Sequence, residues 1–211
     1  MLKGILEEGS FCDDSLAAEY FGGVLASSRS GVLRDDRGAY FIALVAKLST
    51  YQIRAHYVFY HMVKQLYDGS GLRITMGEDA EKMEVFVPFE VFAQALDLSP
   101  DERKNFDALL SHIHIMTGLA KEDLISKEYA SGKMEFMQSH FKDAASSGLI
   151  FQPTTHGALL FLWAYGEGHK KPNGILDTSS NFPLLSGVSV PAGYQKNNGV
   201  TNKKTTKNSC L

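Results

Sequence analysis

Residues 51–67, YQIRAHYVFYHMVKQLY, constrain the fold more than any other stretch of this chain. In a helix, the four consecutive bulky apolar residues 57–60 would cover every side, so such a helix must be enclosed by other elements. Ser49 or Thr50 can cap its start, and the turn-forming sequence DGSG at residues 68–71 ends it. We therefore expect a central helix of a helical core.

Two further helical patterns precede this helix. The segment 38–49, GAYFIALVAKLS, is apolar on nearly every side and predicts a buried helix. The segment 15–28, SLAAEYFGGVLASS, predicts another helix in spite of Gly22 and Gly23, each of which costs about 1 kcal/mol relative to Ala. We interpret this cost as close packing of a second helix against a groove of small residues; a kink is the alternative. The groove consists of Ala18, Gly22 and Ala26.

The middle of the chain mixes strand and helix patterns. Alternating apolar residues predict a short strand over 83–87, and a helix follows over 89–96. The sequence SPDE at 99–102 is a capping-box start for a helix that ends at Gly118.

The following section has the rhythm of a winged-helix-like element. A helix centred on 134–145 and ending at Gly148 is followed by an extended piece over 149–151. Thr154 or Thr155 then caps a second, strongly apolar helix, and this succession is compatible with winged-helix-like packing.

These patterns together predict a mainly α protein: a multi-helix globular bundle with a short strand or small winged-helix-like element in its C-terminal half. We divide the chain into an N-terminal helical subdomain (1–96), a C-terminal helical and winged-helix-like subdomain (97–190), and a mobile basic tail (191–211).

Charge and cysteine content limit the classes of function. The net charge is −3, and residues 191–211 hold four Lys and no acid, which leaves −7 for residues 1–190. Such an acidic body disfavours nucleic acid as a partner, although it does not exclude it. The two cysteines, Cys12 and Cys210, suit neither a disulfide framework nor a metal site. With no signal peptide and no membrane-spanning run in the sequence, we expect a cytoplasmic location.

Known catalytic and metal-binding motifs are missing from the sequence. His112 and His114 are two residues apart, so on a helix they point about 200° away from each other and do not form a metal site. No G-x-S-x-G elbow, P-loop or dinucleotide-binding spacing occurs. We therefore predict no catalytic residue, no metal ligand and no cofactor.

The polar connector SSRSGVLRDDRG, residues 27–38, is the candidate binding site. Asp35 or Asp36 can cap the helix that follows, and the arginines can bond the preceding helix or pair with the aspartates. Arg54 could fold back to join them. This structural interpretation is favoured over a ligand site. The candidate binding residues are Arg29, Arg34, Asp35, Asp36, Arg37 and Arg54.

The block 13–60 resembles proteins of the bacterial abortive-infection alpha (Abi-alpha) family. The matching positions are the Val-Leu-Ala-Ser pattern at 24–27, the Leu48-Ser49 step that ends the next helix, and the later Thr154-x-x-Gly157. The resemblance implies a role in bacterial defence against phage, and it carries no catalytic residues.

We therefore expect a non-enzymatic helical interaction or sensor domain that binds a protein or small-molecule partner. A winged-helix regulator that binds nucleic acid is the first alternative. An enzyme whose site is assembled from scattered polar residues is the second.

Overall fold

The computed structural model describes residues 15–29, 36–105, 111–185 and 188–196. Helices dominate these residues and the strands form one small sheet, so the mainly α class is confirmed. In chain order the described elements are α2 (Ser15–Ser27), α3 (Arg37–Lys47), α4 (Thr50–Tyr67), α5 (Gly77–Lys82), β1 (Val85–Pro88), α6 (Phe89–Ala95), α7 (Pro100–Asn105), the π-helix η1 (Ser111–Met116), α9 (Thr117–Lys121), β2 (Ala130–Gly132), α10 (Met134–His140), β3 (Gly148–Phe151), α11 (Thr155–Ala164), the 3₁₀-helix η2 (Pro172–Leu176) and β4 (Gln195–Lys196).

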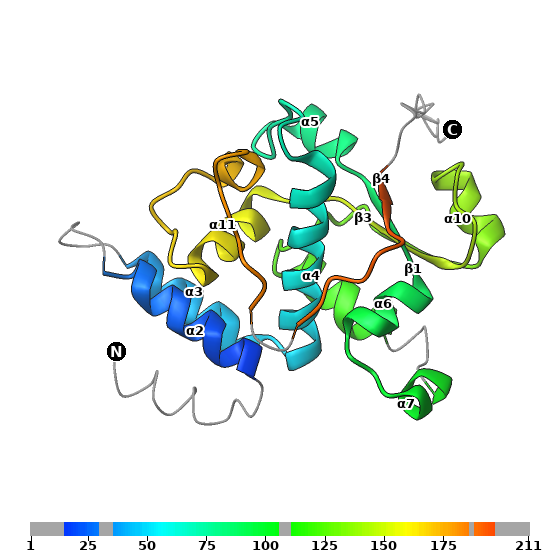
Figure 1. Cartoon of the computed structure of the whole chain (residues 1–211), viewed down its shortest axis with the longest axis horizontal. Coiled ribbons are helices and arrows are strands. Elements are labelled where there is room, and N and C mark those ends of the chain that lie inside the picture. The colour runs from blue at the N-terminus through cyan, green and yellow to red at the C-terminus, as the bar shows by residue number, and fades with distance from the viewer. Residues whose placement is uncertain (1–14, 30–35, 106–110, 186–187, 197–211) are drawn as a thin grey trace, which may run out of the picture.

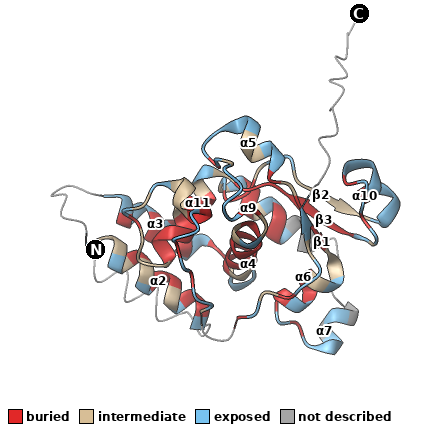
Figure 2. Ribbon diagram, turned by 45° about the horizontal axis from the view of Figure 1, so that its top comes forward, coloured by how far each residue is buried: buried red, intermediate tan, exposed pale blue. Residues whose placement is uncertain are grey.

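Helix α4 runs through the middle of the molecule, with α2 and α3 on one side and the sheet on the other (Figure 1). It begins with a capping box: the Ser49 hydroxyl accepts from the Gln52 N–H, and the Gln52 side chain accepts from the Ser49 N–H. Residues 57–60 are all fully buried, as the colouring of α4 in Figure 2 shows. The expected central core helix is confirmed.

Helices α2 and α11 touch at the backbone through Gly23. A Cβ on Gly23 would overlap the carbonyl group of Ala164, whereas a Cβ on Gly22 would meet nothing within 4 Å. Gly23 lies seven residues after the buried Leu16 and therefore on the same helix face. The expected groove is wrong in its position because its three residues, Ala18, Gly22 and Ala26, are exposed.

Helix α3 is amphipathic, and the prediction of burial on nearly every side was wrong. Its inner face packs against α2 and α11, and its buried side chains include Phe41, Ile42, Leu44 and Val45. Its exposed residues are Arg37, Ala39, Tyr40, Ala43, Ala46 and Lys47, and three of these six are alanines. Alanine exposes little apolar surface, so an outer face of alanines costs little free energy.

The sheet is small, antiparallel and ordered β2-β3-β1-β4. Val85 and Val87 face the main core, where the rings of Phe59 on α4 and Phe151 on β3 stack with centroids 4.1 Å apart. Phe86 points to the other face, into a small cluster beneath α10. The expected strand and the helix after it are confirmed, and the winged-helix-like arrangement stays a prediction.

Two helices end elsewhere than expected. The helical path through η1 continues past Gly118 to the end of α9, and Gly118 lies so close to the Gln52 side chain that a Cβ would overlap it. Helix α10 ends at His140 rather than Gly148, because Phe141 takes an extended conformation and is buried beneath it.

One hydrophobic cluster continues across the expected subdomain boundary at residue 96. Its members include Leu16 from α2 and Val188 from the C-terminal segment. The division into residues 1–96 and 97–190 stays a prediction, and most of the tail lies outside the described residues.

Candidate functional site

The ends of the predicted connector are held together by small residues. Gly38 approaches Ser28 so closely that a Cβ on Gly38 would overlap the Ser28 hydroxyl. The Ser27 hydroxyl donates to the carbonyl of Trp163 on α11 at 3.1 Å and accepts from the Gly168 N–H at 3.1 Å. These contacts fix where α2 ends and α3 begins, whatever the polar residues between them do.

The six predicted binding residues fall into three groups. Arg34 and Asp35 lie outside the described residues. Arg29, Asp36 and Arg37 lie at the two ends of the connector; the Arg29 N–H donates to the Ala26 carbonyl, and Asp36 occupies the cap position of α3 without a side-chain capping bond.

Arg54 makes up the third group. It lies in the first turns of α4, the helix that follows α3. There its guanidinium pairs with Asp97 at 3.4 Å. The expectation that Arg54 also joins the connector stays a prediction.

Arg37 instead meets an aromatic group on α11. Its guanidinium carbon lies 5.4 Å from the centre of the Trp163 ring, a cation–π distance. Phe41, one turn further along α3, packs on the same indole with centroids 4.9 Å apart. The start of α3 is therefore attached to α11 by aromatic contacts.

Tyr40 is the most exposed aromatic side chain next to this contact, with 54% of its surface exposed. Its hydroxyl is hydrogen-bonded to Nε2 of His156 on α11 at 2.9 Å, across 116 residues of sequence. The His156 ring is stacked on Phe41 with an interplanar angle of 19°. Tyr40 is thus both exposed and held in one orientation.

Two carboxylates influence this pair. Partial burial, followed by the negative charges of Glu122 and Asp123, raises the pKa of Tyr40. Burial lowers the pKa of His156, and the same two carboxylates oppose that shift. We call Arg37, Tyr40, Glu122, Asp123 and His156 the Tyr40 surface.

The position of His156 follows from the cap of α11. The Thr154 hydroxyl accepts from the Gly157 N–H at 3.0 Å and lies 2.5 Å from the Asp123 carbonyl, to which it donates. Tyr60 on α4 accepts from the Thr154 N–H at 2.9 Å. The core helix therefore fixes the first turn of α11, and with it the His156 backbone.

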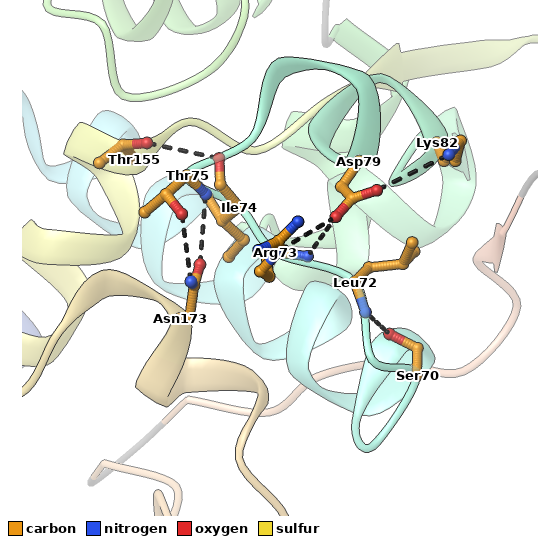
Figure 3. Close-up of polar contacts among 9 residues, drawn as sticks. All are labelled: Ser70, Leu72, Arg73, Ile74, Thr75, Asp79, Lys82, Thr155 and Asn173. Carbon is orange, nitrogen blue, oxygen red and sulfur yellow. Dashed lines mark hydrogen bonds and ion pairs between the residues drawn. The ribbon is translucent and has the colours of Figure 1, made fainter.

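A loop that includes residues 70–75 lies next to Thr155, the first residue of α11 (Figure 3). Thr75 and Asn173 exchange two hydrogen bonds, and the Thr155 hydroxyl donates to the Ile74 carbonyl at 3.4 Å. Asp79 pairs with Arg73 and Lys82 at 3.6 Å each. Each of these polar groups is bonded to another group of the loop or of the neighbouring helices, so we assign this loop a structural role.

The site offers few features of a catalytic centre. Among the described residues, no three His, Cys, Asp or Glu side chains converge as metal ligands would. Ser49 and His114 lie 3.0 Å apart, but the same Ser49 hydroxyl caps α4.

Sequence reasoning identified Arg37 but missed Tyr40 and His156. The sequence could have indicated that Tyr40 is exposed, because Tyr40 precedes Lys47 by seven residues and therefore lies on the same face of the helix. For His156 the sequence held no such signal, since its pairing depends on how α3 and α11 cross.

Comparisons with known proteins do not assign this chain to a family. No family model, curated protein or solved structure matches this chain. Within the described residues, none of the helices combines the length and apolar character needed to cross a bilayer.

Proposed function

We propose that this chain is a non-enzymatic helical interaction domain of a bacterial phage-defence protein related to the Abi-alpha family, acting in the cytoplasm. A partner protein binds at the Tyr40 surface. The observation that carries the proposal is that Tyr40 is 54% exposed and yet fixed by His156.

Energetic considerations favour a protein partner. Tyr and Arg are over-represented among the residues that dominate binding energy at protein interfaces. A side chain already held in its bound orientation loses less conformational entropy on binding, and this raises affinity. Arg37 on one side and Glu122 and Asp123 on the other also give the surface both signs of charge for matching groups.

The defence role rests on the family resemblance. Its residues all lie at helix ends of the core: 24–27 in the last turn of α2, Leu48-Ser49 between α3 and α4, and Thr154 to Gly157 at the cap of α11. Gly157 also lacks the Cβ that would overlap the Tyr60 hydroxyl.

Site-specific photocrosslinking tests the proposal. The chain is expressed in a bacterial host with p-benzoylphenylalanine at position 40 or at position 51, where Tyr51 is 41% exposed and lies in the first turn of α4, outside the Tyr40 surface. We expect a protein adduct at position 40 whose amount changes on phage infection, and none at position 51. No adduct at position 40, or equal adducts at both positions, would refute the proposal.

Nucleic-acid binding through the winged-helix-like element is our alternative proposal. Lys133 and Lys142 are exposed on either side of helix α10, in the segment between the paired strands β2 and β3. Glu135 and Asp143 are exposed beside them, however, and cancel their charge. A mobility shift of plasmid DNA at low salt, weakened by raising the salt concentration, would favour this alternative.

A further inference from the structure

We infer that Asp123 is a specificity-determining residue of the Tyr40 surface, and that its carboxylate pairs with an arginine side chain of the partner protein. This inference rests on the proposed function and adds to it the chemistry of the partner at one point. It is carried by the backbone conformation of Asp123, by its place at the end of a helix, and by a comparison with Asp97.

Asp123 has a backbone conformation that favours glycine. Its φ is +57°, and among the described residues Asp97, at +60°, is the other non-glycine residue with a positive φ. Asp97 follows the end of α6 and Asp123 follows the end of α9. Each precedes a buried leucine, Leu98 or Leu124, whose N–H donates to a carbonyl of the preceding helix. Glycine or asparagine fits this position equally well, so the geometry does not require a negative charge there.

The negative charge of Asp123 is unfavourable where it lies. The last carbonyl groups of a helix carry partial negative charge, so a carboxylate beside them destabilises the helix end. At Asp97 the chain compensates for this effect, because the Arg54 guanidinium lies 3.4 Å from the carboxylate. Glu122 is likewise compensated, by the Lys47 ammonium at 3.7 Å. Asp123 is exposed and pairs with no cation of the described residues, so two helix ends of the same design differ in the missing arginine.

The Asp123 carboxylate acts on the two central residues of the Tyr40 surface. After partial burial, its negative charge is among the causes that raise the pKa of Tyr40. It also opposes the lowering of the pKa of His156 by burial. The Asp123 carbonyl accepts from the Thr154 hydroxyl at the cap of α11, which fixes this residue beside the site. A guanidinium is the cation that suits both neighbours, because it pairs with carboxylates and packs on tyrosine rings.

Denaturant unfolding tests whether the carboxylate serves the fold. Asp123→Asn keeps the size of the side chain and tolerates the same φ, and it removes only the charge, so we expect its unfolding midpoint to rise above that of wild type. Asp97→Asn is the matched control; there the same gain is offset by loss of the ion pair with Arg54, and we expect no rise. An unchanged or lower midpoint for Asp123→Asn would overturn the inference, because the charge would then not be kept at the expense of stability.

Crosslinking tests whether the carboxylate serves a partner. p-Benzoylphenylalanine is placed at position 40 of the otherwise wild-type chain and of chains that also carry Asp123→Asn or Asp97→Asn. We expect Asp123→Asn to lower the adduct yield at least about tenfold, as loss of one member of an interfacial charge pair does. Asp97→Asn should leave the yield unchanged.

The outcomes separate this inference from the proposed function. An adduct at position 40 that Asp123→Asn leaves unchanged, or that both variants lower equally, would overturn the inference and leave the proposed function standing. No adduct in the otherwise wild-type chain would refute the proposed function, and this inference with it.

The partner that the adduct identifies supplies the last test. Changing its contacting arginine to glutamate should abolish the adduct, and Asp123→Arg in this chain should restore it, because the two charges are then exchanged. If no arginine of the partner behaves in this way, the inference is overturned.

Discussion

His56 on α4 donates a hydrogen bond through Nε2 to the carbonyl oxygen of Gly157 on α11, at 3.0 Å. Because a carbonyl can only accept, Nε2 carries the proton, and Nδ1 accepts from the Tyr20 hydroxyl of α2 at 3.1 Å. Burial lowers the pKa of His56 to about 3. A neutral imidazole therefore joins three helices of the core.

This arrangement predicts that acid destabilises the fold before most carboxylates titrate. Burial also lowers the pKa of His61, to about 4. The unfolded chain, with histidine pKa values near 6.5, binds more protons than the folded chain below that pH, so stability present above pH 6.5 is lost progressively toward pH 3. At pH 5.5 we expect a loss of about 1 kcal/mol for each of the two histidines.

Denaturant unfolding at pH 7.5 and 5.5 measures this loss. The control is the titration of His56 and His61, followed by NMR. A midpoint for His56 near the ordinary value would show that its burial does not control the pH dependence.

Substitution by alanine at the two adjacent glycines of α2 should change the free energy of unfolding in opposite directions. In Gly23→Ala the new Cβ would overlap the Ala164 carbonyl, so the α2–α11 contact must open, and we expect a loss of more than about 2 kcal/mol. In Gly22→Ala the Cβ meets nothing within 4 Å, and higher helix propensity should add up to about 1 kcal/mol. Chemical denaturation of both variants tests the pair, and a similar loss in both would contradict the close approach.

The Tyr60→Phe substitution should lower the free energy of unfolding although it keeps the aromatic ring. The Tyr60 hydroxyl donates to the Leu124 carbonyl and accepts from the Thr154 N–H, each at 2.9 Å. Removing it leaves these backbone groups unpaired near the core, at a cost of about 1–3 kcal/mol. Tyr51→Phe, at an exposed position, is the control and should change the free energy of unfolding little.

Much of this core was predictable because it depends on local patterns. Ser49 and Thr154 cap α4 and α11 as expected, since a cap needs only a hydroxyl and an N–H two or three residues later. The alternation around Val85 and Val87 identified β1 for a similar reason. These signals are complete within a few residues of sequence.

The rest depended on contacts between distant segments. Nothing near residues 195–196 indicates a strand, because β4 consists of two residues that exist as a strand only by pairing with β1. Arg54 pairs with Asp97, which no local pattern links to it. Likewise, the Tyr40–His156 pair is created by the crossing of α3 and α11, and Arg34 and Asp35 lie outside the described residues.

Arg37→Ala should leave the fold nearly intact. Arg37 is exposed, and its contact with Trp163 is of the cation–π kind, worth about 0.5–1 kcal/mol at exposed sites. Denaturant unfolding should therefore show a loss below about 1 kcal/mol, while the crosslinking yield at position 40 falls. A loss of several kcal/mol would mean that Arg37 serves the fold rather than a partner.

The central claim, that Tyr40 is a binding anchor of a phage-defence protein, is tested most directly by plating efficiency. Phage are plated on hosts expressing the wild-type chain, Tyr40→Ala or Tyr51→Ala from the native gene neighbourhood, with protein levels matched. We predict that Tyr40→Ala abolishes protection and that Tyr51→Ala keeps it. Full protection by Tyr40→Ala, or no protection by the wild-type chain against any phage, would contradict the claim.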